Sequence, residues 1–173
     1  KVEGNYDKTL ISGLTSFRGV NIFSLDTIKA TNFLLRTNPW LKKVTLIKDY
    51  PHTIDMILEK NQPVADLKVA NGFYLLSSEG VIIAKSKRHN NKYPVINYFQ
   101  QFDYFSSQAG DKIDYKDILF SLNFVSVVDN LGYEINSIDI SSRGMIALNL
   151  AEEGRKIIFS SEINEEEQSY KIK

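Results

Sequence analysis

Few side chains of this chain could carry out chemistry. The sequence has no cysteine and two histidines, His52 and His89, so a nitrogen or sulfur metal site would need both histidines and several carboxylates in one place. His52 falls in a predicted turn, where a solvated histidine is the simpler interpretation. Asp111, Asp114 and Asp117 are spaced like possible metal ligands, but helix capping and the helix dipole explain them more simply. We therefore expect no metal and no cofactor.

Catalytic motifs are absent from the sequence as well. It contains no G-x-x-x-x-G-K-[ST], H-E-x-x-H, G-x-S-x-G or C-x-x-C pattern. Carboxylate pairs such as Asp55 and Glu59 fall on the polar face of a predicted strand, as solvated residues do, so a hydrolase using Asp and Glu has little support. The sequence predicts a protein that is not an enzyme and binds no small-molecule substrate.

The charge distribution argues against nucleic-acid binding. The 21 basic and 21 acidic residues cancel, whereas a nucleic-acid-binding protein is expected to carry a strongly basic face. The one basic cluster runs from Lys85 to Lys92. No aromatic residue interleaves its charges, so we interpret it as a solvated connecting loop rather than a surface for lipid headgroups or a wall polymer.

The elements that would position any site begin with a strand–turn–strand unit. Apolar residues alternate over residues 41–48 and 53–60, the period-two pattern of half-buried strands. Between these segments, Pro51 fixes its own φ and disfavours helix at Tyr50, which predicts a turn over residues 49–52.

Two helices are expected before these strands. Ser24 can cap a helix over residues 25–36, with Leu25, Ile28 and Leu35 on one stripe. A shorter helix is expected over residues 9–15, and residues 1–5 read as the end of a first strand. Trp40, the only tryptophan, is expected to fill the core between helix and sheet.

Four segments between residues 19 and 65 read GVNIFSL, NPWLKKV, YPHTI and EKNQPVA. They resemble the polypeptide-transport-associated (POTRA) domain of the FtsQ/DivIB family of bacterial cell-division proteins, whose pattern reads roughly G-x-N-I-F-x-L, P-W-V, W-P-x-T-L-x-I and E-R-x-P-x-A at this spacing. Tyr50, Leu41 and Lys60 replace the usual Trp, Val and Arg, and each replacement keeps size or charge. The resemblance implies a POTRA domain over residues 1–70, in the order strand, helix, helix, strand, strand.

After Asn71-Gly72 the pattern changes. Strands over residues 73–76 and 81–84 are predicted to form a hairpin, and a helix over residues 115–131 is predicted with Asp114 as its cap and Gly132 as its stop. A three-stranded antiparallel meander over residues 138–160 closes the chain. This region, residues 71–173, is similar to the mixed α/β "β-domain" of the family with its final strand missing. The expected fold class is therefore α+β.

The resemblance implies a non-enzymatic scaffold of the division machinery at the cell (inner) membrane and septum. The family's cytoplasmic tail and single transmembrane helix would precede Lys1, which would make this region extracytoplasmic. Its partners would be FtsB (DivIC)-like and FtsL-like bitopic proteins. The alternative is a POTRA-containing module of an outer-membrane assembly or secretion machine that binds client polypeptides. Such a pore protein should continue into many amphipathic strands of about 10 residues, whereas here a helix and a short meander follow.

The last predicted strand is the expected partner-binding edge. In the family this region recruits the small bitopic partners, which implies a role for Lys156, Ile157, Ile158, Phe159 and Ser160. Ile157 and Phe159 should share one face, with Lys156 and Ile158 on the other. An incoming strand would bond to the unpaired backbone groups of this edge, which is β-augmentation. A helix is expected over residues 162–172.

Overall fold

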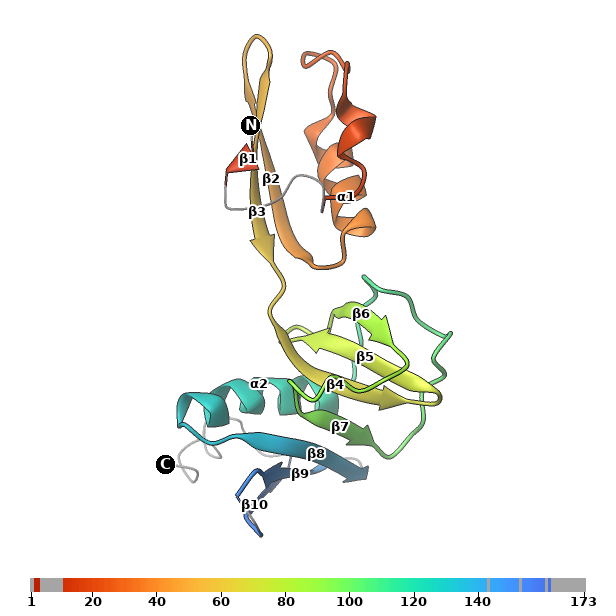
Figure 1. The fold of residues 1–173 in the computed structure, drawn as a ribbon, viewed down its shortest axis with the longest axis vertical. Helices are drawn as coiled ribbons and strands as arrows, with labels where there is room; N and C mark the ends of the chain where they lie inside the picture. The colour runs from red at the N-terminus through yellow and green to blue at the C-terminus, as the bar shows by residue number, and fades with distance from the viewer. Residues whose placement is uncertain (1, 4–10, 143, 153, 161, 163–173) are drawn as a thin grey trace. The chain divides into compact units, whose positions relative to one another are not determined.

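The computed structural model describes residues 2–3, 11–142, 144–152, 154–160 and 162. The chain divides into two compact units, Lys1–Asn61 and Gln62–Lys173 (Figure 1). Helices and strands occur in both, so the α+β class is confirmed. Neither of the α-helices in the described ranges has the length and apolar character needed to cross a membrane, since the longer one has 15 residues.

Among its described residues, unit 1 has a three-stranded sheet and one α-helix. Its order is β1-β3-β2, with β1 parallel and β2 antiparallel to β3. The predicted strand–turn–strand unit and the first strand are confirmed. The described elements are β1 (Val2–Glu3), the 3-10 helix η2 (Leu14–Phe17), α1 (Thr27–Thr37), β2 (Leu41–Asp49) and β3 (Thr53–Lys60).

The predicted start of the first α-helix was wrong. Asp26, not Ser24, is the cap: its carboxylate accepts the backbone N–H groups of Ile28 and Lys29 at 3.0 and 3.1 Å. The Ser24 hydroxyl instead donates to the carbonyl of Asn21, within the preceding turn. The buried residues of α1 are Ala30 and Leu34, whereas Ile28, a predicted core residue, is 73% exposed.

The core of unit 1 lies between α1 and the sheet. Leu34 is fully buried there, and Trp40 packs against this core as predicted. Asn38 closes the helix, because its side-chain amide donates to the carbonyl of Leu34 at 2.9 Å. Of the short helix predicted over residues 9–15, residues 9 and 10 lie outside the described residues. The helix seen instead is η2, one short 3-10 turn.

Unit 2 contains a seven-stranded mixed sheet with the order β10-β9-β8-β7-β4-β5-β6. The three central strands β8, β7 and β4 are mutually parallel, and the outer pairs are antiparallel. The elements are β4 (Pro63–Val69), β5 (Gly72–Ser77), β6 (Ile82–Ser86), β7 (Val95–Tyr98), α2 (Lys116–Asn130), β8 (Ile135–Ser142), β9 (Met145–Leu150) and β10 (Lys156–Ser160).

Helix α2 packs against one face of this sheet (Figure 1). Ile118, Leu122 and Phe124 are almost fully buried in that contact, which confirms the predicted helix and its wide apolar face. The predicted cap was wrong. The helix begins at Lys116 with Tyr115 at the cap position and no side-chain cap, so Asp114 lies one residue too early to accept its first N–H groups.

The sequence placed the end of the first domain one strand too late. Strand β4, which a boundary near residue 70 assigns to the first domain, is one of the three central strands of the second sheet. It pairs with β5 and with β7, a strand that the sequence analysis did not predict. Strand β7 has four residues and follows a polar loop, which gives too short a pattern to recognise.

Candidate partner-binding edge

Strand β10 lies at one end of the seven-stranded sheet, where the sequence predicted the partner-binding edge. Its two faces match the expected alternation. Phe159 is 7% exposed and stacks on Phe124 of α2, with ring centroids 4.5 Å apart. Ile158, on the opposite face, is 67% exposed. The strand is therefore anchored through one face while the other face is open to solvent.

The backbone register shows which groups of β10 point away from the sheet. Leu150 N–H donates to the carbonyl of Arg155 at 3.1 Å, so these two residues face each other across a hydrogen-bonded position. In an antiparallel pair such positions alternate, and the register between β9 and β10 is uninterrupted. Ile157 and Phe159 therefore bond to β9. Lys156 and Ile158 direct their N–H and C=O groups outward, where the described part of the chain places no further strand.

A groove of about 560 Å³ borders this edge. Tyr133, from the loop after α2, and Leu150 of β9 line it together with β10. The groove would receive side chains on one face of a strand paired with β10. Tyr133 is a residue that the sequence analysis missed, because it lies in a turn with no periodic signal.

The opposite end of the sheet is closed by its own chain. Ile82 of β6 donates its N–H to the carbonyl of Asp111 at 2.9 Å and accepts the N–H of Gly110 at 2.8 Å. Ile113 N–H donates to the carbonyl of Gly80, also at 2.8 Å. The segment of residues 110–113 therefore occupies the outer side of β6, as natural sheets often protect their edges.

Two lysines of the basic cluster lie against aromatic rings, which corrects the prediction of a solvated loop. The Lys87 and Lys85 ammonium groups lie 3.7 and 4.4 Å from the centroid of the Tyr104 ring, and Lys85 also donates to the carbonyl of Ser107 at 2.6 Å. These cation–π contacts hold the loop after β7 against β6. The sequence could not show them, because Tyr104 is distant along the chain.

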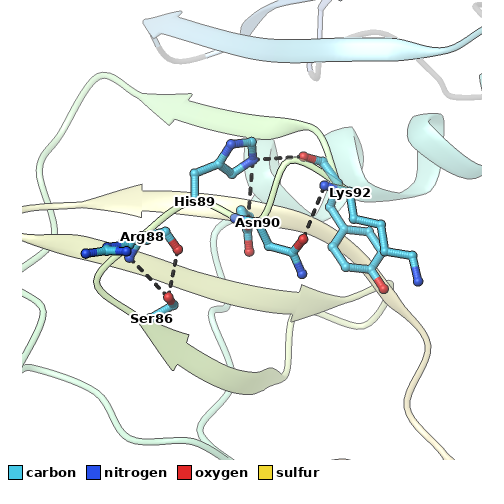
Figure 2. A network of polar contacts seen from close by, with 7 residues as sticks. Ser86, Arg88, His89, Asn90 and Lys92 are labelled. Atoms are coloured by element: carbon cyan, nitrogen blue, oxygen red, sulfur yellow. Dashed lines mark hydrogen bonds and ion pairs between the residues drawn. The ribbon is translucent and has the colours of Figure 1, made fainter.

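The rest of the basic cluster forms an ordered loop over β4 (Figure 2). Its His89 ring lies 3.6 Å from the Asp66 carboxylate and donates from Nε2 to the carbonyl of Tyr93 at 3.0 Å. Asn90 N–H also donates to Asp66, at 3.2 Å. Burial raises the pKa of the Asp66 carboxyl above its ordinary value, and the Asn90 hydrogen bond and the nearby His89 partly offset the rise.

A cleft of about 740 Å³ lies where β4, β7 and β8 begin, beside α2. Its lining includes His89, Lys92, Asp129 and Glu134. Within the described residues, no three His, Cys, Asp or Glu side chains gather as metal ligands would. His52 lies exposed in the turn between β2 and β3.

Of the three spaced aspartates, Asp111 accepts the N–H of Gln108 at 2.7 Å in a turn. Asp117 lies in the first turn of α2, where the helix dipole favours a negative charge. The local turn and helix therefore account for these two positions.

Comparison with known proteins supports the resemblance. The chain is 32% identical over 88 residues to the cell division protein FtsQ of Rickettsia bellii, a match that covers 49% of this chain and 33% of that protein. It is 26% identical over 120 residues to the cell division protein DivIB of Clostridium botulinum, covering 68% of this chain and 46% of that protein. FtsQ of Geotalea daltonii is 29% identical over 82 residues, a match that covers 47% of this chain and 30% of that protein.

These matches, at about 30% identity over about half of the chain, support the FtsQ/DivIB family. No family model matches the chain. The matches span 30–46% of the length of the FtsQ and DivIB proteins compared above. Its α+β fold, with mixed sheets and two α-helices in the described residues, is compatible with the FtsQ/DivIB family.

Proposed function

We propose that this chain is the extracytoplasmic part of a bacterial cell-division scaffold and that β10 is its partner-binding edge. The partners would be FtsB (DivIC)-like and FtsL-like segments, which would add a strand to β10 by β-augmentation. Unit 1 would be the POTRA domain and unit 2 the β-domain. A transmembrane helix before Lys1 would anchor the protein in the cell membrane at the septum, and the protein would have no catalytic role.

One observation carries the proposal: the two ends of the seven-stranded sheet differ. The β6 end bonds to residues 110–113 of its own chain, whereas the outward N–H and C=O groups of Lys156 and Ile158 meet no other strand among the described residues. An incoming strand gains main-chain hydrogen bonds only at an edge with free groups. Phe159 holds β10 to α2 from the inner face, so the edge is rigid before a partner arrives.

The decisive experiment removes one outward donor and keeps the fold. Ile158→Pro eliminates an N–H that points away from β9, so the β9–β10 ladder should persist. Ile158→Ala is the matched control, because it truncates the same exposed side chain but keeps the N–H. Pull-down of FtsB-like and FtsL-like segments should fall about tenfold for the proline variant, the equivalent of one or two lost hydrogen bonds. The alanine variant should lose much less.

Circular dichroism and thermal unfolding would confirm that both variants are folded. If Ile158→Pro is folded and captures the segments as well as wild type does, β10 is not the binding edge. The next edge to test would then be β2 in unit 1, near Val44 and Leu46, which pairs only with β3 in the described sheet.

A further inference from the structure

Unit 1 exposes a pair of stacked aromatic rings. Phe23 is 70% exposed and Tyr50 is 55% exposed, although their rings stack with centroids 5.0 Å apart and an interplanar angle of 25°. Val20, three residues before Phe23 in the chain, is 45% exposed. We call Val20, Phe23 and Tyr50 the tip patch. Single exposed apolar residues are ordinary, but a cluster of this kind marks an interaction surface.

The tip patch is built into the fold. Phe23 N–H donates to the Asn21 side chain at 2.9 Å, and Leu25 N–H donates to the Asn21 carbonyl at 3.1 Å. Ile22, the residue between Asn21 and Phe23, is 7% exposed, and its buried side chain anchors the turn to the rest of unit 1. These contacts fix the backbone of the turn that carries Phe23, and its ring stays 70% exposed although it stacks on Tyr50.

The patch lies at one end of unit 1. Tyr50 belongs to the turn between β2 and β3, and Phe23 belongs to the turn before α1, so the stacking joins two turns at the same end (Figure 1). The connection from α1 to β2 lies at the other end, where Leu41 N–H donates to the carbonyl of Asn38 at 2.9 Å.

The direction of β1 shows from which end of unit 1 the chain enters this strand. Strand β1 is parallel to β3, with Val2 opposite Met56 and Glu3 opposite Ile57. Strand β3 begins at Thr53, directly after the turn that holds Tyr50. A parallel neighbour starts from the same end, so the chain enters β1 from the side of the tip patch.

We infer that the tip patch rests in the headgroup region of the membrane that anchors the protein. The inference depends on the proposed transmembrane helix upstream of β1, which would emerge on the side of the patch. Aromatic rings with a polar end, such as tyrosine, favour this interface. In the sequence, Arg18 lies two residues before Val20, and Lys48 and Asp49 directly precede Tyr50. The charge near the patch along the chain is therefore mixed, and an anionic lipid should not be required.

A membrane fits this patch better than a soluble protein partner does. Three side chains cover much less than the roughly 800 Å² per partner that a stable protein interface buries. A tethered surface needs little intrinsic affinity, because the anchor supplies a high effective concentration at the bilayer. The patch would then set the orientation of unit 1 on the membrane.

The test places tryptophan probes in the whole chain tethered through its N-terminal end. A histidine tag before Lys1 would bind vesicles of phosphatidylcholine and nickel-chelating lipid, with bromine on the acyl chains as a short-range quencher. Phe23→Trp reports on the tip patch. Phe33→Trp is the matched control, since Phe33 is 40% exposed on α1 of the same unit, further from the tip. Wild type gives the baseline from Trp40.

Phe23→Trp should be quenched at least about twice as strongly as Phe33→Trp, with a blue shift of its emission, because interfacial aromatic residues lie among the headgroups. Vesicles containing phosphatidylglycerol should give the same ratio. Equal quenching of the two probes, or none beyond wild type, would overturn the inference. Capture of partner segments by β10 should be unchanged in Phe23→Trp, so the two proposals can fail separately.

Discussion

The two edge strands of the seven-stranded sheet, β6 and β10, differ in what their outward backbone N–H and C=O groups contact. Any edge strand carries unpaired N–H and C=O groups that invite another strand. At β6 the chain's own residues 110–113 take those groups, and two lysine–tyrosine contacts hold the neighbouring loop. At β10 the outward groups of Lys156 and Ile158 face no other described strand. This difference is the basis of the proposal that an external strand would pair with β10.

The largest expected contrast comes from proline at each edge. Ile82→Pro should destabilise the fold by about 4 kcal/mol or more, because it removes a fully buried side chain and the N–H that bonds to Asp111. Ile158→Pro should cost about 1 kcal/mol or less. Urea unfolding would measure both, with Ile82→Ala as the control that separates the side chain from the hydrogen bond. Similar losses for the two proline variants would contradict the contrast between the edges.

A smaller effect should follow from loosening the cover of β6. Tyr74 is fully buried, and its hydroxyl lies 2.7 Å from the carbonyl of Asp103 and 2.9 Å from that of Tyr104. Tyr74→Phe keeps the ring and removes this donor, so it should cost about 1–2 kcal/mol. Hydrogen exchange should become faster at the Ile82 amide and stay unchanged at Ile157. Equal acceleration at both amides would mean that the loop does not specifically protect the β6 end.

The smallest effect concerns Asp66, beneath the loop that leaves β6. Its raised pKa means that the folded chain holds this proton more tightly than the unfolded chain. Its contribution to stability is therefore greatest at low pH and falls as the pH rises from the unfolded to the folded pKa. Asp66→Asn keeps an oxygen for the Asn90 N–H and removes the buried charge, so it should be up to about 1 kcal/mol more stable at neutral pH.

This gain should shrink as the pH is lowered through the range where the carboxyl gains its proton. Urea unfolding of both proteins at neutral and at acidic pH would measure it. A variant that is markedly less stable than wild type at neutral pH would show that the pair with His89 outweighs the cost of burying the charge.

Much of the fold could be predicted because it depends on local pattern. The alternation of apolar and polar residues predicted β2, β3 and the C-terminal meander, and apolar residues at helical spacing predicted α2. One error occurred where two residues could have the same role. Ser24 and Asp26 could both cap α1, and Asp26 does so because the Ser24 hydroxyl donates to the carbonyl of Asn21. Strand β7 was missed because only its neighbours β4 and β8 make it a strand.

The sequence by itself determined the family, the fold class and the faces of β10, because these follow from residue order and a period of two. It could not determine that, among the described residues, the chain itself covers the β6 edge and not the β10 edge. That depends on residues 110–113 meeting β6, on Tyr104 meeting two lysines, and on the position of β7 between β4 and β8. Such contacts join segments far apart in the chain, and no local pattern encodes them. Only the tertiary structure brings them together.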